Sequence, residues 1–310
     1  MSIEFQDVSK NFGKFKALDQ VDFTVKEGEV VGFAGLNGAG KTTSMKIACG
    51  VINPSQGDVL IDGMSVRKDK IRINGAVAWV PENSLLDNME KPKSIFMEVG
   101  TYLSMRRAEI IERMQKAMKA VSLDTKANIR IGNMSNGMRK RMHIAIGIFM
   151  DSKNYLLDET FNGLDPSGVF FLKDTIRNLK KEGKSVLLST HILPEISELC
   201  DRLIIINKGK ILDNVMVDDI VNKVTVEVSF YCKNEIDNEN IVNILSAFGD
   251  VELSIEESKR YGKATIKNYS GKKGSSFKVA ESLNKIQLDV ISLSERKEEV
   301  EEYFKRKISE

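Results

Sequence analysis

The sequence lacks several features that would direct its interpretation elsewhere. Only three of its 310 residues are cysteines, and they are scattered without a C-x-x-C pair, so neither a disulfide framework nor a zinc site is expected. No run of about 18 apolar residues occurs, so the chain offers no candidate for a membrane-spanning helix. The formal net charge of only +2 gives the whole chain no electrostatic argument for binding nucleic acid.

The N-terminal stretch does not look like a targeting signal. Residues 1–15 mix Glu4, Asp7, Lys10 and Lys14 with apolar side chains, whereas a secretory signal needs an uninterrupted apolar core. The composition, with 42% hydrophobic and 29% charged residues, is ordinary for a globular protein. We therefore expect a cytoplasmic protein of two domains with reduced thiols, and at a membrane another chain would have to supply the span.

A glycine-rich loop follows an apolar run within residues 30–43, VVGFAGLNGAGKTT. Its spacing fits G-x-x-x-x-G-K-[ST] between a strand and a helix, which is typical of a phosphate-binding loop. Without Cβ atoms, successive N–H groups can turn toward phosphate oxygens, and the helix N-terminus adds positive charge. Lys41 would reach the β- and γ-phosphates, and the Thr42 hydroxyl would bind Mg²⁺. The predicted loop contacts are Gly35, Asn37, Gly38, Ala39, Gly40, Lys41, Thr42 and Thr43.

Two acids end a second apolar run, YLLDE at residues 155–159. Asp158 would hold Mg²⁺, through water, and Glu159 could activate the attacking water as a general base. Paired acids at a strand end can also be a solvated turn. The phosphate-binding loop alone leaves kinases, GTPases and ATPases open.

A third motif, MSNGMRKRM at residues 134–142, separates the loop from the acids. Ser135 can cap the following helix and direct its N-terminus at an anion, although by itself it is only a helix cap. Here the chain resembles the ATP-binding cassette (ABC) family over roughly residues 2–217. The family signature is usually Leu-Ser-Gly-Gly-Gln. Ser135 and Gly137 are kept, whereas Asn136 and Met138 depart from it.

The resemblance implies roles for three further residues. Asp165, within residues 162–166, corresponds to the family's D-loop, which crosses the interface of two cassettes. His191, in residues 189–191, corresponds to the switch histidine, which would bond the γ-phosphate and steady Glu159. Phe12 stands where the family stacks an aromatic ring on adenine, and a simple packing residue is the alternative.

Two positions depart from the family pattern. Glu82 stands where a glutamine is usual. It can still accept a hydrogen bond from metal-bound water, but it adds negative charge near Mg²⁺. Thr160 replaces the proline that usually follows the catalytic acid, which loosens the turn and removes no chemical group.

The expected fold is α/β, a P-loop NTPase of the ABC cassette type. It has a mixed sheet core, an antiparallel β subdomain and a helical subdomain at about 83–150. This nucleotide-binding domain should span residues 1–223. Residues 224–310 show the order β-α-β-β-α-β of a small ferredoxin-like α+β domain, in which we find no chemical motif.

The predicted function is the ATP-hydrolysing subunit of an ABC transporter that powers a separately encoded permease at the cytoplasmic face of the membrane. The chain looks most similar to the exporter-type branch, and we expect a homodimer, with a heterodimer as the next choice. A soluble ABC ATPase acting on ribosomes or DNA is the alternative. It commonly has two cassettes or a long coiled-coil insertion, which this sequence lacks. A binding module without turnover conflicts with Glu159 and His191.

Overall fold

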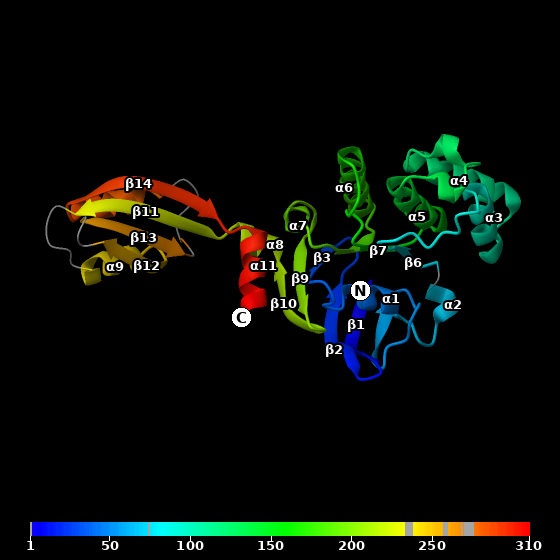
Figure 1. The fold of residues 1–310 in the computed structure, drawn as a ribbon, viewed down its shortest axis with the longest axis horizontal. Helices are drawn as coiled ribbons and strands as arrows, with labels where there is room; N and C mark the ends of the chain where they lie inside the picture. The colour runs from blue at the N-terminus through cyan, green and yellow to red at the C-terminus, as the bar shows by residue number, and fades with distance from the viewer. Residues whose placement is uncertain (1, 74, 233–237, 257–259, 268, 270–275) are drawn as a thin grey trace. The chain divides into compact units, whose positions relative to one another are not determined.

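The structure is a computed structural model that describes residues 2–73, 75–232, 238–256, 260–267, 269 and 276–310 (Figure 1). By contacts it divides into two compact units. The first runs to Met216 and includes residues 307–310, and the second comprises residues 217–306. The predicted domain boundary at residue 223 stays a prediction. The contacts divide the chain earlier, so that α8 (Val217–Val221) is grouped with the second unit.

A six-stranded sheet forms the centre of the first unit, and every neighbouring pair except β9–β10 is parallel. Strands β3, β8 and β7 are buried along their whole length, as expected for parallel strands covered on both faces. Their carboxyl ends lie at one edge, where side chains from distant segments meet. In sheet order the strands are β10 (Lys210–Met216), β9 (Arg202–Asn207), β3 (Val30–Ala34), β8 (Ser185–Ser189), β7 (Asn154–Asp158) and β6 (Val77–Val80).

A second, antiparallel sheet has the order β2-β1-β4-β5. It shares one apolar core with α1 (Lys41–Ala48) and the central sheet, and in this core Phe5 stacks on Phe23 with ring centroids 4.3 Å apart. The predicted antiparallel subdomain is therefore confirmed. Its strands are β1 (Ile3–Phe12), β2 (Phe15–Val25), β4 (Gln56–Ile61) and β5 (Met64–Ser65), and the short α2 (Lys70–Ile73) follows them.

Three helices form the predicted helical subdomain: α3 (Pro92–Tyr102), α4 (Arg107–Ala120) and α5 (Asn136–Met150). Helices α3 and α4 lie so close that a Cβ on Gly100 would meet Ile110 at 2.4 Å. Helix α5 joins this group to the central sheet, because Gly147 lies directly against Ala78 and Tyr155. Short 3-10 turns (Asp124–Lys126 and Ile131–Asn133) lead into α5, and α6 (Pro166–Lys181) and α7 (Leu193–Leu199) complete the unit.

Strand β6 lies at the edge of the central sheet and leads directly to Glu82. It carries Trp79, the chain's single tryptophan, whose indole nitrogen is buried and has no hydrogen-bond partner among the residues described. In the described ranges, no helix combines the length and the apolar character needed to cross a membrane.

The second unit has one antiparallel sheet of order β12-β13-β11-β14. The order of its elements along the chain is the one that the sequence predicts for a ferredoxin-like unit. One apolar core, which includes Phe230, Ile241 and Leu283, joins the sheet to its helices. The elements are β11 (Val224–Cys232), α9 (Asn238–Ser246), β12 (Asp250–Glu256), β13 (Tyr261–Lys267), α10 (Phe277–Lys285) and β14 (Leu288–Lys297), followed by α11 (Val300–Ser309), of which the residues from 307 on are grouped with the first unit.

Candidate functional site

The glycine-rich loop connects β3 to α1, as the sequence predicts. Two of its glycines are required, one because a side chain would collide with its neighbours and one because its φ is positive. A Cβ on Gly35 would lie 2.3 Å from the carbonyl oxygen of Ile206, and Gly40 adopts a left-handed φ of 116°. Gly40 is also the N-cap of α1, with no capping side chain and no acid in the first turn. The first N–H groups of α1 are therefore free of side-chain caps and suited to an anion.

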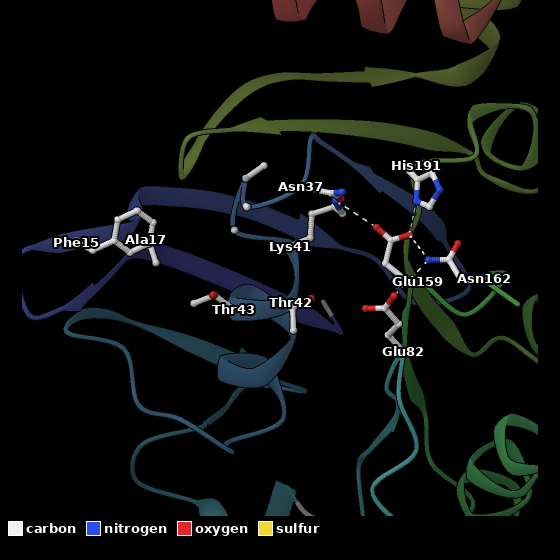
Figure 2. Close-up of a pocket in the computed structure, with 13 residues that line it drawn as sticks. Phe15, Ala17, Asn37, Lys41, Thr42, Thr43, Glu82, Glu159, Asn162 and His191 are labelled. Atoms are coloured by element: carbon white, nitrogen blue, oxygen red, sulfur yellow. Dashed lines mark hydrogen bonds and ion pairs between the residues drawn. The ribbon is translucent and has the colours of Figure 1, made fainter. Parts of the chain in front are cut away.

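Lys41 is buried at the start of α1. Its ammonium donates to the carbonyl oxygen of Gly35 at 2.7 Å and to that of Leu36 at 3.3 Å. It also lies 3.2 Å from Oε1 of Glu159. The loop lysine and the predicted catalytic acid, far apart in the sequence, thus form a buried ion pair (dashed in Figure 2).

Glu159 follows β7, and hydrogen bonds hold both its backbone and its carboxylate. Its backbone N–H donates to the carbonyl oxygen of Ser189 at 3.1 Å. Its Oε2 lies 2.8 Å from Nδ1 of His191 and 3.5 Å from the amide nitrogen of Asn162 (Figure 2). The φ of Glu159 is 46°, a left-handed conformation that costs a non-glycine residue about 1–2 kcal/mol. Such strain persists where the surroundings fix the backbone, and it is common at functional sites.

Asp158 lies one residue earlier, at the buried end of β7. Its Oδ1 accepts hydrogen bonds from the Ser189 hydroxyl at 2.8 Å and from the Thr42 hydroxyl at 3.3 Å. Burial raises the pKa of this carboxyl, and the negative charges of Glu159 and Glu82 add to the effect. A cation beside Thr42 and Asp158 would relieve this excess of negative charge. The donor set of one hydroxyl and one carboxylate therefore fits Mg²⁺, which prefers oxygen ligands and keeps several waters.

These groups meet around a pocket of about 410 Å³. Ten of the predicted site residues line it: Asn37, Gly38, Ala39, Gly40, Lys41, Thr42, Thr43, Glu82, Glu159 and His191. Three lining residues are additional to the prediction, namely Phe15, Ala17 and Asn162. Asn162 lies within the D-loop motif, and its amide lies between two acids, at 3.4 Å from Glu82 and 3.5 Å from Glu159. The sequence offers one indication of this role, because Asn162 follows the predicted catalytic acid Glu159 by only three residues.

Phe12, the predicted adenine contact, is not among the lining residues. It pairs with Phe15 across the tip of the β1–β2 hairpin, so both rings lie on the same face of the sheet. Phe15 is 64% exposed and Phe12 is 49% exposed, with the Lys10 ammonium 5.0 Å from the Phe12 ring centroid. Phe12 as the stacking residue therefore stays a prediction, and Phe15 is a second aromatic ring at the same end of the hairpin.

Ser135, Gly137 and Asp165 also lie away from the pocket lining. Ser135 is the N-cap of α5 and accepts from the N–H of Met138 at 3.2 Å. Asp165 is the N-cap of α6 and accepts from the N–H of Gly168 at 3.0 Å. The Ser167 hydroxyl and this N–H lower the pKa of the Asp165 carboxyl. Within one chain Ser135 and Asp165 cap helices, Gly137 lies in the first turn of α5, and none of the three lines the pocket around Lys41.

A phosphate-binding loop with a buried lysine, facing a strand that ends in two acids and a histidine that touches the second acid, defines a P-loop nucleoside triphosphatase. Comparisons with known proteins narrow this class. The family model described as ABC transporter matches residues 18–162. An uncharacterized ABC transporter ATP-binding protein of Methanocaldococcus jannaschii is 32% identical, over 82% of this chain and 94% of that protein.

Two further matches agree with this family. A Nod factor export ATP-binding protein of Sinorhizobium fredii is 30% identical over 74% of this chain and 68% of its own length. A solved structure titled as the ATP-binding subunit of an ABC transporter superposes with a TM-score of 0.66 at 27% identity, over 72% of this chain and 92% of that one. The chain belongs to the ABC transporter family, and its site is that of an ATP-binding, ATP-hydrolysing subunit.

Proposed function

We propose that this subunit hydrolyses Mg²⁺–ATP in a composite site formed with a second copy of the chain, and that the cycle powers a separately encoded membrane permease. The observation that carries the proposal is Glu159, whose two carboxylate oxygens contact Lys41 at 3.2 Å and His191 at 2.8 Å. This arrangement joins a phosphate-binding cation to a general base and its partner.

The chain's groups divide the chemistry among them. Lys41 would exchange its contacts with Gly35 and Glu159 for the β- and γ-phosphates, which are stronger acceptors. Glu159, released from the lysine, would accept the proton of the attacking water, and His191 would hold its orientation. Bound Mg²⁺, held by Thr42 and Asp158, would neutralise charge on the phosphate oxygens. Glu82 lines the same pocket, and its contact with the metal-bound water is part of the proposal.

A second copy would supply what the pocket lacks. Ser135 and Gly137 lie at the N-terminus of α5, a helix of 15 residues with no acid in its first turn. This end of a helix favours phosphate, yet in one chain it lies outside the pocket lining. In a head-to-tail homodimer it would close over the partner's nucleotide, with Asp165 at the interface. ATP would then hold the dimer closed and hydrolysis would open it.

The permease contact is proposed for the segment that follows Glu82. This segment exposes Leu85 (70%) and Met89 (65%), apolar side chains that a partner helix could cover. Because this segment directly follows the pocket residue Glu82, nucleotide binding and permease contact would be coupled there. Export is the proposed direction, supported by the relative named for Nod factor export. The location would be the cytoplasmic face of the membrane, through the permease.

The dimer is tested with Glu159→Gln, which keeps the shape of the side chain and removes the base. We expect this variant to bind ATP, to turn over at least about a hundredfold more slowly, and to elute as a dimer with Mg²⁺–ATP but not with Mg²⁺–ADP. The matched control adds Ser135→Arg to the same variant, which should bind ATP and stay monomeric. A monomer of Glu159→Gln that is saturated with ATP would overturn the composite site.

The permease is tested by purifying the tagged chain from detergent-solubilised membranes. A polytopic membrane protein that copurifies with the parent, and is lost from Leu85→Asp/Met89→Asp, supports the proposal. Activation of the ATPase by RNA, with no membrane protein retained, would favour the ribosomal alternative.

A further inference from the structure

A buried lysine on α5 has no part in the proposed chemistry. Lys140 lies only five residues after Ser135 and is 3% exposed. Its ammonium donates to the backbone carbonyl oxygens of Asn162 at 2.6 Å and Thr160 at 2.8 Å, and it lies 3.5 Å from that of Glu159. A buried ammonium is costly unless it is paired, and here backbone dipoles of one short turn provide the pairing.

The turn that Lys140 holds is the one that places the catalytic acid. Glu159 has a left-handed φ of 46°, and Thr160 stands where the family usually has proline. The Thr160 hydroxyl is buried and makes no hydrogen bond to any described residue. The turn's own bonds are the N–H of Asn162 to the carbonyl oxygen of Glu159 at 3.1 Å and that of Leu164 to Phe161 at 3.4 Å. Support from outside the turn comes from Ser189, which accepts from the N–H of Glu159, and from Lys140, which donates to the carbonyl oxygens of Thr160 and Asn162.

The start of α5 makes a second contact with the same segment. A Cβ on Gly163 would lie 3.2 Å from the Asn136 amide nitrogen, and one on Gly137 would lie 3.5 Å from Leu164. The charged groups that face Lys140 are the carboxylates of Glu82 and Glu159, which oppose the lowering of the Lys140 pKa by burial. The helix with the signature residues is thus joined to residues 159–164 of its own chain.

We propose that Lys140 is a positioning residue that fixes the Glu159 turn from helix α5, so that the helix closing over the partner's nucleotide is mechanically linked to the catalytic acid of its own site. This deepens the proposed function and rests on it. Lys140 is not among the residues that line the pocket. Its removal should slow hydrolysis while leaving ATP binding in place.

The test compares Lys140→Met with Lys140→Gln, which keeps two N–H donors and is expected to fold even if the methionine variant does not. Lys153→Met, which removes an exposed lysine of the same unit, is the matched control. We expect kcat to fall by roughly tenfold in Lys140→Met and less in Lys140→Gln, with KM for ATP changed less than about threefold. The control should match the parent. In the Glu159→Gln background, Lys140→Met should still form the ATP-dependent dimer.

A second measurement does not depend on activity. Hydrogen exchange of the amides of residues 159–164 should accelerate in both Lys140 variants and stay unchanged in Lys153→Met. Unchanged exchange there, or a kcat within twofold of the parent in a folded variant, overturns the proposal. A Lys140→Met variant that loses ATP affinity and turnover to the same extent also overturns the proposal. A parent chain that neither turns over nor forms the ATP-dependent dimer would instead reject the proposed function, while the exchange result still decides whether Lys140 holds the turn.

Discussion

The two units of the molecule differ in whether they bury charged side chains. The first unit buries Lys41, Lys140, Asp158 and Glu159, all of them in or next to the nucleotide site. Within the part of the second unit that the structure describes, no charged side chain is buried. Its ion pairs lie on the surface, as between Lys263 and Glu227 at 2.8 Å. Buried charges destabilise a fold unless they are well paired, so their concentration in one unit marks where chemistry is done.

The comparison predicts where substitutions affect activity and where they affect only folding. Lys41→Ala should have the largest effect, because it removes the phosphate contact and leaves Glu159 buried without its cation. We expect turnover to fall by roughly a thousandfold, about 4 kcal/mol in the barrier, with weakened ATP binding. Lys46→Ala, on the same helix, is the control. Parent-like ATP affinity in Lys41→Ala would reject the phosphate-binding loop.

Phe230→Ala is the corresponding test of the second unit. Phe230 is fully buried, and its ring lies against Gly262. The cavity should destabilise this unit by about 3 kcal/mol, measured as an earlier unfolding transition. ATP hydrolysis by the folded protein should stay within about twofold of the parent, because the apolar core carries no catalytic group. A tenfold loss of turnover at a temperature where the variant is folded would show that the second unit acts on the site.

His143 gives a smaller, pH-dependent effect. It lies on α5, its Nε2 is 3.1 Å from the Ser84 hydroxyl, and burial lowers its pKa to about 4 from 6.5. Between these values the unfolded chain binds a proton that the folded chain does not, so stability should decrease as pH falls. From pH 7 to pH 5 the loss is about 2 kcal/mol. Urea unfolding of parent and His143→Gln at both pH values measures it, and an equal pH dependence in the two proteins would contradict the assignment.

The smallest expected effect concerns the adenine contact. Phe12→Ala should weaken ATP binding by about 1 kcal/mol, roughly fivefold, through the loss of one stacked ring. Phe15→Ala, measured beside it, distinguishes the two rings of the hairpin. A greater loss from Phe15→Ala would move the stacking residue to the start of β2.

The sequence predicted most of the residues that line the pocket, because its motifs have fixed spacing and obligatory geometry. Gly35 and Gly40 have to be glycines, since a side chain at either would meet neighbouring atoms. Asp158 ends a buried strand and Glu159 follows it, at the edge where parallel strands end. Three-dimensional neighbours were not predictable in this way. Phe15 lines the pocket because the paired rings of Phe12 and Phe15 lie on one face of the β1–β2 hairpin. The sequence does not show which face of the hairpin is turned to the pocket.

Lys140 was missed for a different reason. A lysine in a basic run on a helix is usually exposed, and only the packing of α5 on residues 159–164 shows that its ammonium is enclosed by carbonyl oxygens. The order of elements in the second unit was predictable from alternating apolar positions. The division after Met216 rests on contacts between residues far apart in the sequence, which the sequence alone does not show.

Strand β6 carries the only tryptophan of the chain, so it determines the intrinsic tryptophan fluorescence of the protein. Trp79 is the chain's single tryptophan, and it lies three residues before Glu82, on the strand that leads into the pocket and toward the proposed permease contact. All indole fluorescence of the native chain therefore arises at this one point. A change in the emission of Trp79 on addition of nucleotide would report movement of this segment in the unmodified protein.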